Sequence, residues 1–350
     1  MRDVAVVSFA QTPNVRREPR NEVEMLVELI PEVVQASGIP REKIGFTCSG
    51  SCDYIAGQPF SFVTALDAAG AWPPIAESHV EMDGAWALYE AWVKIQTGQC
   101  DSALVYGFGK SSMGSPADVV TLQLDPYLIA PLWPTAIHVA ALQARKLIDA
   151  GKTSEREMAE VAARNRKAAL ANPSAQLAGA CDVDDLLAAP YLANPLRKHD
   201  CPPITDGASA IVLAAGDLAR EVSKRPAWIR GLDHRVEPHS PGARDLTVSR
   251  STRVAAEQAG AAAGGLDVAE VHAPFTHQER LVTEALGLPE QCEVNPSGGA
   301  LAAHPFMTAG LTRIGEVAQR ILDGQAGRGV AHATSGPCLQ QNLVCLLEGE

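Results

Sequence analysis

The stretch Asn295-Pro296-Ser297-Gly298-Gly299-Ala300-Leu301-Ala302-Ala303-His304-Pro305 is the most informative part of this 350-residue chain. With the following Ala309-Gly310 it contains three glycines, two prolines and one histidine within sixteen residues, a composition typical of a turn-rich loop before a helix. Glycines let backbone N–H groups approach a ligand closely, and a histidine can donate a hydrogen bond to an oxyanion. The same composition suits an ordinary helix-initiating turn, so both interpretations stay open at this point.

Strand-like and helix-like segments alternate on both sides of this chain's middle, which predicts an α/β fold. In the first part we expect strands at 4–9, 44–48, 77–82 and 102–108 and helices at 22–37, 60–69 and 84–97. A looser stretch ends at a strand over 206–213, and the alternation then restarts. There we expect strands at 228–232, 268–272, 330–333 and 343–347 and helices at 251–263, 277–286 and 307–322. Two series of similar order predict a duplicated fold.

Composition and charge exclude several classes of protein. The chain is 46% hydrophobic, enough for one large core or two ordinary ones. Its 29 basic and 41 acidic residues give a net charge of −12, which disfavours nucleic acid and anionic membranes as partners. The apolar runs 4–10 and 136–144 are too short to span a bilayer, and the first is too short for a secretory signal. We therefore expect a cytoplasmic protein without membrane insertion.

The cysteines indicate neither a disulfide framework nor a metal site. The chain has eight of them, without CxxC pairs and without disulfide-dense spacing. Cys48 and Cys52 lack the further ligands that a four-coordinate metal requires. We expect most of the cysteines to be small buried residues and no metal to be bound.

Several segments together resemble the thiolase superfamily. Residues 295–299 with His304-Pro305 are similar to its Asn-Pro-x-Gly-Gly loop ending in Gly-His-Pro, with Ala303 in place of the usual glycine. His272-Ala273-Pro274-Phe275 resembles the His-Asp-Cys-Phe loop of the sterol-carrier thiolases, and Asp206-Gly207-Ala208 resembles the closing strand of the family's N-terminal half. Further similar segments lie over most of the chain and point to thiolase-like bacterial lipid-transfer proteins of steroid catabolism: 49–51, 77–83, 106–110 and 335–342.

The resemblance implies the thiolase fold, in which two similar βαβαβ halves pack into five αβαβα layers. It assigns residues 1–110 to the first part of the N-terminal half and 111–200 to an insertion over the site. Residues 201–224 supply the closing strand and helix of that half, and 225–350 form the C-terminal half. Family members dimerise through their N-terminal sheets, so a homodimer or a heteromer is implied.

The family's two cysteines are missing or displaced in this sequence. A thiolase of this family uses a nucleophilic cysteine at the start of the third helix of the N-terminal half, and that position falls on Asp83 or Gly84. A carboxylate there can cap a helix, but it cannot form a thioester. The family's C-terminal acid/base cysteine falls on Gly336, which leaves Cys338 two positions late.

The sequence keeps the histidine pair that binds the thioester oxygen in the family, as His272 and His304. We expect each of them to point an N–H group at that oxygen. An enolate site without a nucleophile fits retro-aldol cleavage of a bulky lipid or steroid acyl-CoA. Asp83, Cys338 and His79 are then candidate acids and bases. Coenzyme A would enter as part of the acyl-CoA substrate, with no permanently bound cofactor. The candidate residues for contacting it are Ser297, Gly298, Gly299 and Lys110.

Three other functions stay open from the sequence. The chain could be a non-catalytic subunit that pairs with a sister thiolase-like chain or with a small OB-fold protein of the DUF35 type. It could bind or transfer a lipid without reaction. It could also be a true acyltransferase that uses an unexpected cysteine.

Overall fold

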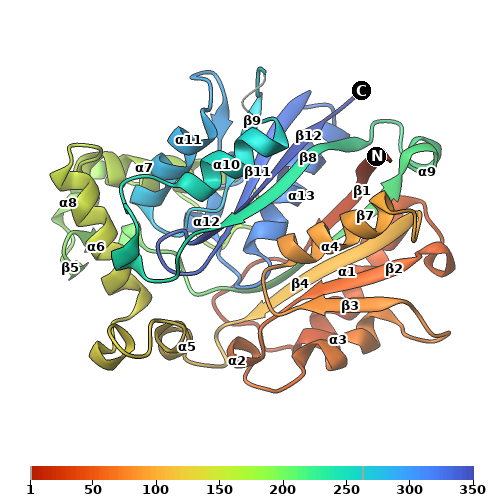
Figure 1. Cartoon of the computed structure of the whole chain (residues 1–350), viewed down its shortest axis with the longest axis horizontal. Coiled ribbons are helices and arrows are strands. Elements are labelled where there is room, and N and C mark those ends of the chain that lie inside the picture. The colour runs from red at the N-terminus through yellow and green to blue at the C-terminus, as the bar shows by residue number, and fades with distance from the viewer. Residues whose placement is uncertain (1, 262–263) are drawn as a thin grey trace.

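The computed structural model describes residues 2–261 and 264–350 and contains a large sheet built from two matching halves (Figure 1). The ten-stranded sheet has the order β10-β9-β11-β12-β8-β1-β7-β4-β2-β3. The N-terminal half contributes β1 (Val4–Gln11), β2 (Phe46–Gly50), β3 (Glu77–Val80), β4 (Ser102–Lys110) and β7 (Asp206–Ala215). The C-terminal half contributes β8 (Ala227–Val236), β9 (Val268–Val271), β10 (Glu293–Val294), β11 (Arg328–Ser335) and β12 (Gln341–Glu348).

The two halves repeat the same topology. Counted outward from the central pair, the N-terminal half runs β1-β7-β4-β2-β3 and the C-terminal half runs β8-β12-β11-β9-β10. Each half thus places its first, fifth, fourth, second and third strand in the same order. The halves join where β1 and β8 pair antiparallel, over only Ala5↔Trp228 and Val6↔Ala227. The duplication predicted from the order of elements is therefore present in the sheet.

Helices cover both outer faces and fill the space between the two half-sheets. On the outer faces lie α1 (Glu22–Ser37) and α3 (Ser61–Ala69) for the N-terminal half, and α10 (Arg250–Ala259) and α11 (Thr276–Leu286) for the C-terminal half. Between the half-sheets lie α4 (Gly84–Gln96) and α13 (Ala309–Leu322). Leu88 of α4 and Ile314 of α13 share one buried cluster with Val105 of β4 and Cys345 of β12. This arrangement gives the five layers.

Local sequence explains the ends of the best predicted helix. Helix α1 begins after Asn21, whose side chain accepts from Glu24 N–H while Glu24 accepts from Asn21 N–H, a capping box. It ends at Gly38, which adopts the left-handed conformation with φ of 70°. Met25, Leu29 and Val33 lie on its buried side. The predicted bounds 22–37 are confirmed.

Other predicted elements need correction. The strand expected over 268–272 ends at Val271, so His272 is the first residue after β9. The helix expected over 251–263 ends at Ala259, and its expected last two residues lie outside the described residues. Two short strand pairs were not expected: β10 beside β9, and the separate β5 (Tyr191–Ala193) with β6 (Leu196–Arg197). Strands of two or three residues carry too little periodicity to be recognised.

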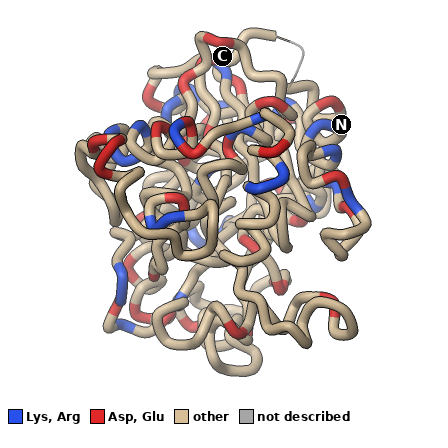
Figure 2. The backbone as a smooth tube through the Cα atoms, turned by 90° about the vertical axis from the view of Figure 1, so that its left-hand side faces the viewer, with Lys and Arg blue, Asp and Glu red and all other residues tan. Residues whose placement is uncertain are grey.

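The segment between β4 and β7 is mainly helical. It contains α5 (Pro116–Leu122), α6 (Ala136–Asp149), α7 (Glu155–Ala168) and α8 (Val183–Ala188). The remaining helices are short: α2 (Asp53–Ala56), α9 (Gly216–Val222) and α12 (Gly299–Ala302). Among the described residues no helix is both long and apolar enough to cross a bilayer. Acidic and basic residues are interspersed along the backbone (Figure 2).

Gly231 allows β8 and α10 to approach each other closely. A Cβ at this position would lie 2.0 Å from the backbone oxygen of Ala259, the last residue of α10. We expect Gly231→Ala to lower the free energy of unfolding by about 1–3 kcal/mol, because backbone atoms must move apart. Urea unfolding checks this. Gly216→Ala is the matched control, since nothing lies within 4 Å of its added Cβ; equal stability of the two variants would contradict the prediction.

Candidate functional site

A pocket of about 170 Å³ lies where several strands end. His272 follows β9, Thr334 and Ser335 end the parallel neighbour β11, and Asp83 lies between β3 and α4. The carboxyl ends of parallel strands are a usual place for a ligand in α/β folds. The helical segment between β4 and β7 contributes Val120 of α5 to the lining, among other residues. The pocket therefore combines residues from both halves and from this helical segment.

His272 and His304 meet inside this pocket. Their Nε2 atoms are 2.8 Å apart, and both side chains are buried. The backbone N–H of Thr334 donates to Nδ1 of His272 at 3.3 Å. Nδ1 of His272 is thus an acceptor, so its proton is on Nε2 and is donated to Nε2 of His304. His304 then carries its own proton on Nδ1, which has no hydrogen-bond partner among the described residues.

Burial keeps both imidazoles neutral. Desolvation lowers the pKa of His304 to about 4 and lowers that of His272 well below 6.5, and each ring's neighbours add to the effect. Two neutral rings in Nε2–Nε2 contact share one proton between them. The expectation that both histidines present an N–H to one oxygen is therefore corrected. The His272 N–H and the His304 lone pair satisfy each other in this structure. A substrate that replaces this contact meets a donor on His272 and an acceptor on His304, so that one ring holds an oxyanion and the other accepts a proton.

Asp83 joins the N-termini of the two central helices. Its Oδ1 accepts from Ala85 N–H and Leu311 N–H at 2.9 Å, and its Oδ2 accepts from Gly310 N–H at 2.8 Å. Thr308, the N-cap residue of α13, makes no side-chain cap of its own. Burial raises the pKa of Asp83, and the three backbone donors oppose that rise. Asp83 lines the pocket, but its oxygens are engaged by both helices.

Cys338 is the one cysteine among the described residues that line the pocket. Its Sγ lies 3.7 Å from the backbone oxygen of Val139, and burial raises the pKa of the thiol to about 12. A protonated thiol is a poor nucleophile. Cys338 and the next residue, Leu339, have φ of 53° and 59°, so two residues with Cβ atoms occupy the left-handed region in this wall.

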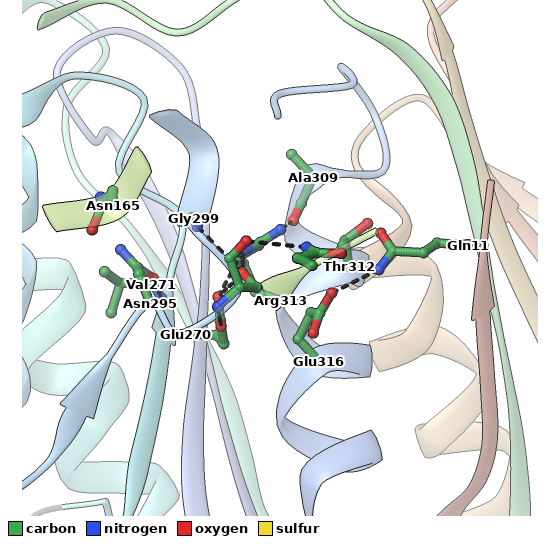
Figure 3. Close-up of polar contacts among 12 residues, drawn as sticks. Gln11, Asn165, Glu270, Val271, Asn295, Gly299, Ala309, Thr312, Arg313 and Glu316 are labelled. Atoms are coloured by element: carbon green, nitrogen blue, oxygen red, sulfur yellow. Dashed lines mark hydrogen bonds and ion pairs between the residues drawn. The ribbon is translucent and has the colours of Figure 1, made fainter. Parts of the chain in front are cut away.

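The loop 295–299 is anchored by buried charges (Figure 3). Glu270 accepts from the backbone N–H and the hydroxyl of Ser297 at 2.8 and 2.7 Å. Arg313 of α13 forms an ion pair with Glu270 at 2.6 Å and donates to the Ser297 hydroxyl. Glu279 accepts from the Asn295 amide at 2.8 Å. The loop thus fixes the chain that leads through α12 to His304.

Two of the four residues expected to contact coenzyme A, Ser297 and Lys110, are engaged by other parts of the protein. Ser297 is buried by the contacts just described, and a Cβ at Gly298 or Gly299 would collide with neighbouring atoms of the protein. Lys110 is buried, donates to the backbone oxygens of Glu18 and Arg20, and lies 3.8 Å from Asp206. These interactions occupy Lys110 and Ser297, so their expected contacts with coenzyme A are corrected. Contact of Gly298 and Gly299 with coenzyme A stays a prediction.

His79 is also apart from the pocket. It lies on β3 and stacks on Phe62, with ring centroids 3.5 Å apart. His79 is not among the pocket residues. Within the described part of the chain, no group of three or more His, Cys, Asp or Glu side chains is arranged to hold a metal ion.

Thr334, Glu270 and Arg313 were not predicted from the sequence as residues of the site. Thr334 acts through its backbone N–H, which leaves no trace in the identity of a residue. Glu270 lies within the apolar run of β9, and Arg313 lies on the strongly amphipathic α13. Charged residues at such core positions are rarely buried unless they are paired, and this was the signal that could have found them.

A duplicated sheet in which a His-x-x-Phe loop and a His-Pro loop meet at one pocket defines a protein of the thiolase fold. No protein-family model matches the chain. Curated relatives are thiolases and related proteins. The acetyl-CoA acetyltransferase of Methanothermobacter thermautotrophicus is 28% identical over 94% of this chain and 93% of its own. The benzoylsuccinyl-CoA thiolase subunit BbsB of Thauera aromatica is 25% identical over 89% of each chain.

Sterol carrier protein 2 of Homo sapiens is 26% identical over 70% of this chain and 52% of its own length. Two solved structures each have a TM-score of 0.80. One is titled Ltp2-ChsH2(DUF35) aldolase, with 16% identity over 99% of this chain and 97% of that chain. The other is the Bacillus anthracis acetyl-CoA acetyltransferase, with 17% identity over 100% and 99%. The predicted thiolase fold is thereby confirmed, and the chain is thiolase-like in sequence along most of its length.

Removing the Asp83 carboxylate should destabilise the protein strongly. We expect Asp83→Ala to lower the free energy of unfolding by about 3 kcal/mol or more, because it leaves three buried N–H groups without acceptors. Asp83→Asn keeps one acceptor oxygen and should cost less. Asp182→Ala, which removes the side chain capping the exposed start of α8, serves as the control and should cost about 1 kcal/mol. Urea unfolding would contradict the prediction if Asp83→Ala and Asp182→Ala lost the same stability.

Acid should weaken the fold through its buried histidines. Burial lowers the pKa of His304 and His332 to about 4 and that of His277 to about 3, whereas unfolded histidines titrate near 6.5. Below pH 6.5 these histidines therefore become protonated in the unfolded chain but stay neutral in the native state. The stability present above pH 6.5 is lost as the pH falls, by on the order of 2 kcal/mol per histidine at pH 5.

The check compares unfolding free energies at pH 7.5 and 5.0. His332→Gln keeps a donor for the Asn342 oxygen, which His332 contacts at 2.9 Å, and should show a smaller loss at pH 5 than the parent protein. His239→Gln, at an exposed position, should keep the parent's loss. An unchanged loss in His332→Gln would show that this histidine does not contribute.

Proposed function

We propose that this protein acts on acyl-CoA thioesters and cleaves a carbon–carbon bond by a retro-aldol reaction without a cysteine nucleophile. The observation that carries the proposal is the His272–His304 pair, with Nε2 atoms 2.8 Å apart, in a pocket where a carboxylate occupies the start of α4. The substrate class within this proposal is a β-hydroxyacyl-CoA with a bulky lipid or steroid chain.

The chemistry balances within the substrate itself. The substrate first replaces the contact between the two imidazoles. His304 Nε2 then accepts the proton of the β-hydroxyl group, and the bond between the α and β carbons breaks. The β carbon becomes the carbonyl of a ketone or aldehyde, and the released electron pair forms the enolate of a shortened acyl-CoA. His272 Nε2–H donates to that enolate oxygen, a contribution of about 3 kcal/mol for a well-placed donor. The proton then passes to the α carbon, so neither water nor an oxidant is consumed.

The comparisons support an acyl-CoA substrate and leave the reaction open. The curated relatives named above are mostly acyl-CoA thiolases and acetyltransferases, while one structural neighbour is titled an aldolase. Acyl transfer would require an ionised thiol. The pocket cysteine in the described part of the chain, Cys338, has its pKa raised to about 12, which favours the reaction without a nucleophile.

A second candidate is a non-catalytic subunit of a heteromeric complex. Asp83 favours this alternative, because its three backbone hydrogen bonds use the carboxylate for structure rather than for chemistry. The names of two similar proteins point the same way, one being a thiolase subunit and the other a complex with a DUF35 protein. The partner would then be a sister thiolase-like chain or a DUF35-type OB-fold protein.

The experiment is cleavage of a panel of β-hydroxyacyl-CoA thioesters, with the carbonyl product and the shortened acyl-CoA quantified by mass spectrometry. We expect His304→Ala to lose at least 100-fold in turnover, by the scale of a removed oxyanion donor or base. Cys338→Ala should retain turnover, and so should His239→Ala at an exposed position.

Four outcomes would count against the proposal. Unchanged turnover in His304→Ala removes the role of the pair. Activity that appears only with free CoA and disappears in Cys338→Ala indicates acyl transfer instead. Tight binding of a lipid acyl-CoA with no product after long incubation indicates lipid binding or transfer, and turnover that requires a co-purifying chain indicates the subunit role.

A further inference from the structure

The pocket wall carries no positive side chain among the described residues. Its polar members are the two histidines, Asp83 and Cys338, together with Gln123, Gln278, Thr334 and Ser335. The rest of the wall is largely apolar and includes Leu124, Val139, Phe275, Phe306 and Met307. Both histidines are held neutral by burial, as described above. The pocket therefore offers hydrogen bonds but no cation.

The half-buried Arg244 and the buried Arg313 direct their hydrogen bonds at other groups of the protein. Arg244 donates to the backbone oxygens of Pro337 and Cys338, at 2.7 and 3.2 Å, and so supports the wall from behind. Arg313 is paired with Glu270. Neither arginine is among the residues that line the pocket. A negative group placed inside would have no partner of opposite charge in the wall.

From this wall we infer that the pocket selects acyl groups that are uncharged and excludes acyl groups that carry a second carboxylate; the inference rests on the proposed acyl-CoA function. A carboxylate that enters an apolar pocket without a cation loses its hydration and gains no compensating ion pair. Asp83 at the same wall adds a like charge whenever it is ionised. Hydrogen bonds from neutral donors do not offset that cost fully.

The test compares acyl-CoA pairs that differ only in the terminal carboxylate: butyryl-CoA against succinyl-CoA, and hexanoyl-CoA against adipoyl-CoA. Isothermal titration calorimetry on the full chain measures each Kd, with free CoA as the reference. We expect the neutral member to bind at least tenfold more tightly in both pairs. Equal binding, or tighter binding of the dicarboxylic member, would overturn the inference.

A positive charge added to the wall should weaken the preference for neutral acyl groups. Gln123 lines the pocket and is exposed to solvent. The substitution Gln123→Arg therefore places a cation at the pocket. We expect this variant to bring the Kd ratio of each pair to about threefold or less. Leu122→Arg is the matched control, because Leu122 is 61% exposed on α5 and does not line the pocket. This control adds the same charge at the adjacent residue and should keep the parent protein's ratio of Kd values.

The variants separate failure of this inference from failure of the proposed function. If no acyl-CoA binds more tightly than free CoA, the proposed acyl-CoA function fails, and the charge selection falls with it. If neutral acyl-CoA binds well but Gln123→Arg and Leu122→Arg change the ratios equally, long-range attraction accounts for the selectivity and the inference about the wall is overturned.

Discussion

The meeting of two helix N-termini in the dry middle layer is the constraint on which the rest of this structure depends. Helices α4 and α13 lie between the half-sheets, so water cannot satisfy their first N–H groups. Asp83 accepts from both helices and brings a negative charge to two positive dipole ends. The same junction places the turn after β3 beside the His-Pro loop. The contacts that pack the two halves together therefore also form part of the pocket.

Burial also sets the chemistry that the pocket can perform. It keeps the imidazoles of His272 and His304 neutral and the thiol of Cys338 protonated. A neutral imidazole carries a proton on one nitrogen and can accept a hydrogen bond at the other. In His272 the Thr334 N–H donates to Nδ1, so the proton is on Nε2. The buried Glu270–Arg313 ion pair does not line the pocket but anchors the loop before His304. Among the described residues the wall itself carries one carboxylate, Asp83, whose oxygens are held by backbone N–H groups.

Much of the fold was predictable from local pattern. Helix α1 is a clear case, because its apolar spacing, its Asn21 cap and its Gly38 end are all local features. The duplication followed from element order alone. The short strand β10 and the β5–β6 hairpin were not predictable, because so few residues define them. Residues of the site were predictable only where the side chain itself indicates a chemical role, as it does for the two histidines. Lys110 and Ser297 were misassigned because a polar residue at the end of a strand or in a loop looks accessible until its buried partners are known.

The sequence by itself determined the order of the elements, the two histidine loops and the absence of a cysteine at the start of α4. These follow from residue identity and short-range periodicity, which a chain carries before it folds. Only the tertiary structure decided that the two imidazoles share one proton, that Asp83 caps two helices and that no cation lines the described pocket wall. Each of these depends on groups far apart in the chain, from positions 83 to 334, and their protonation depends on the water that folding removes.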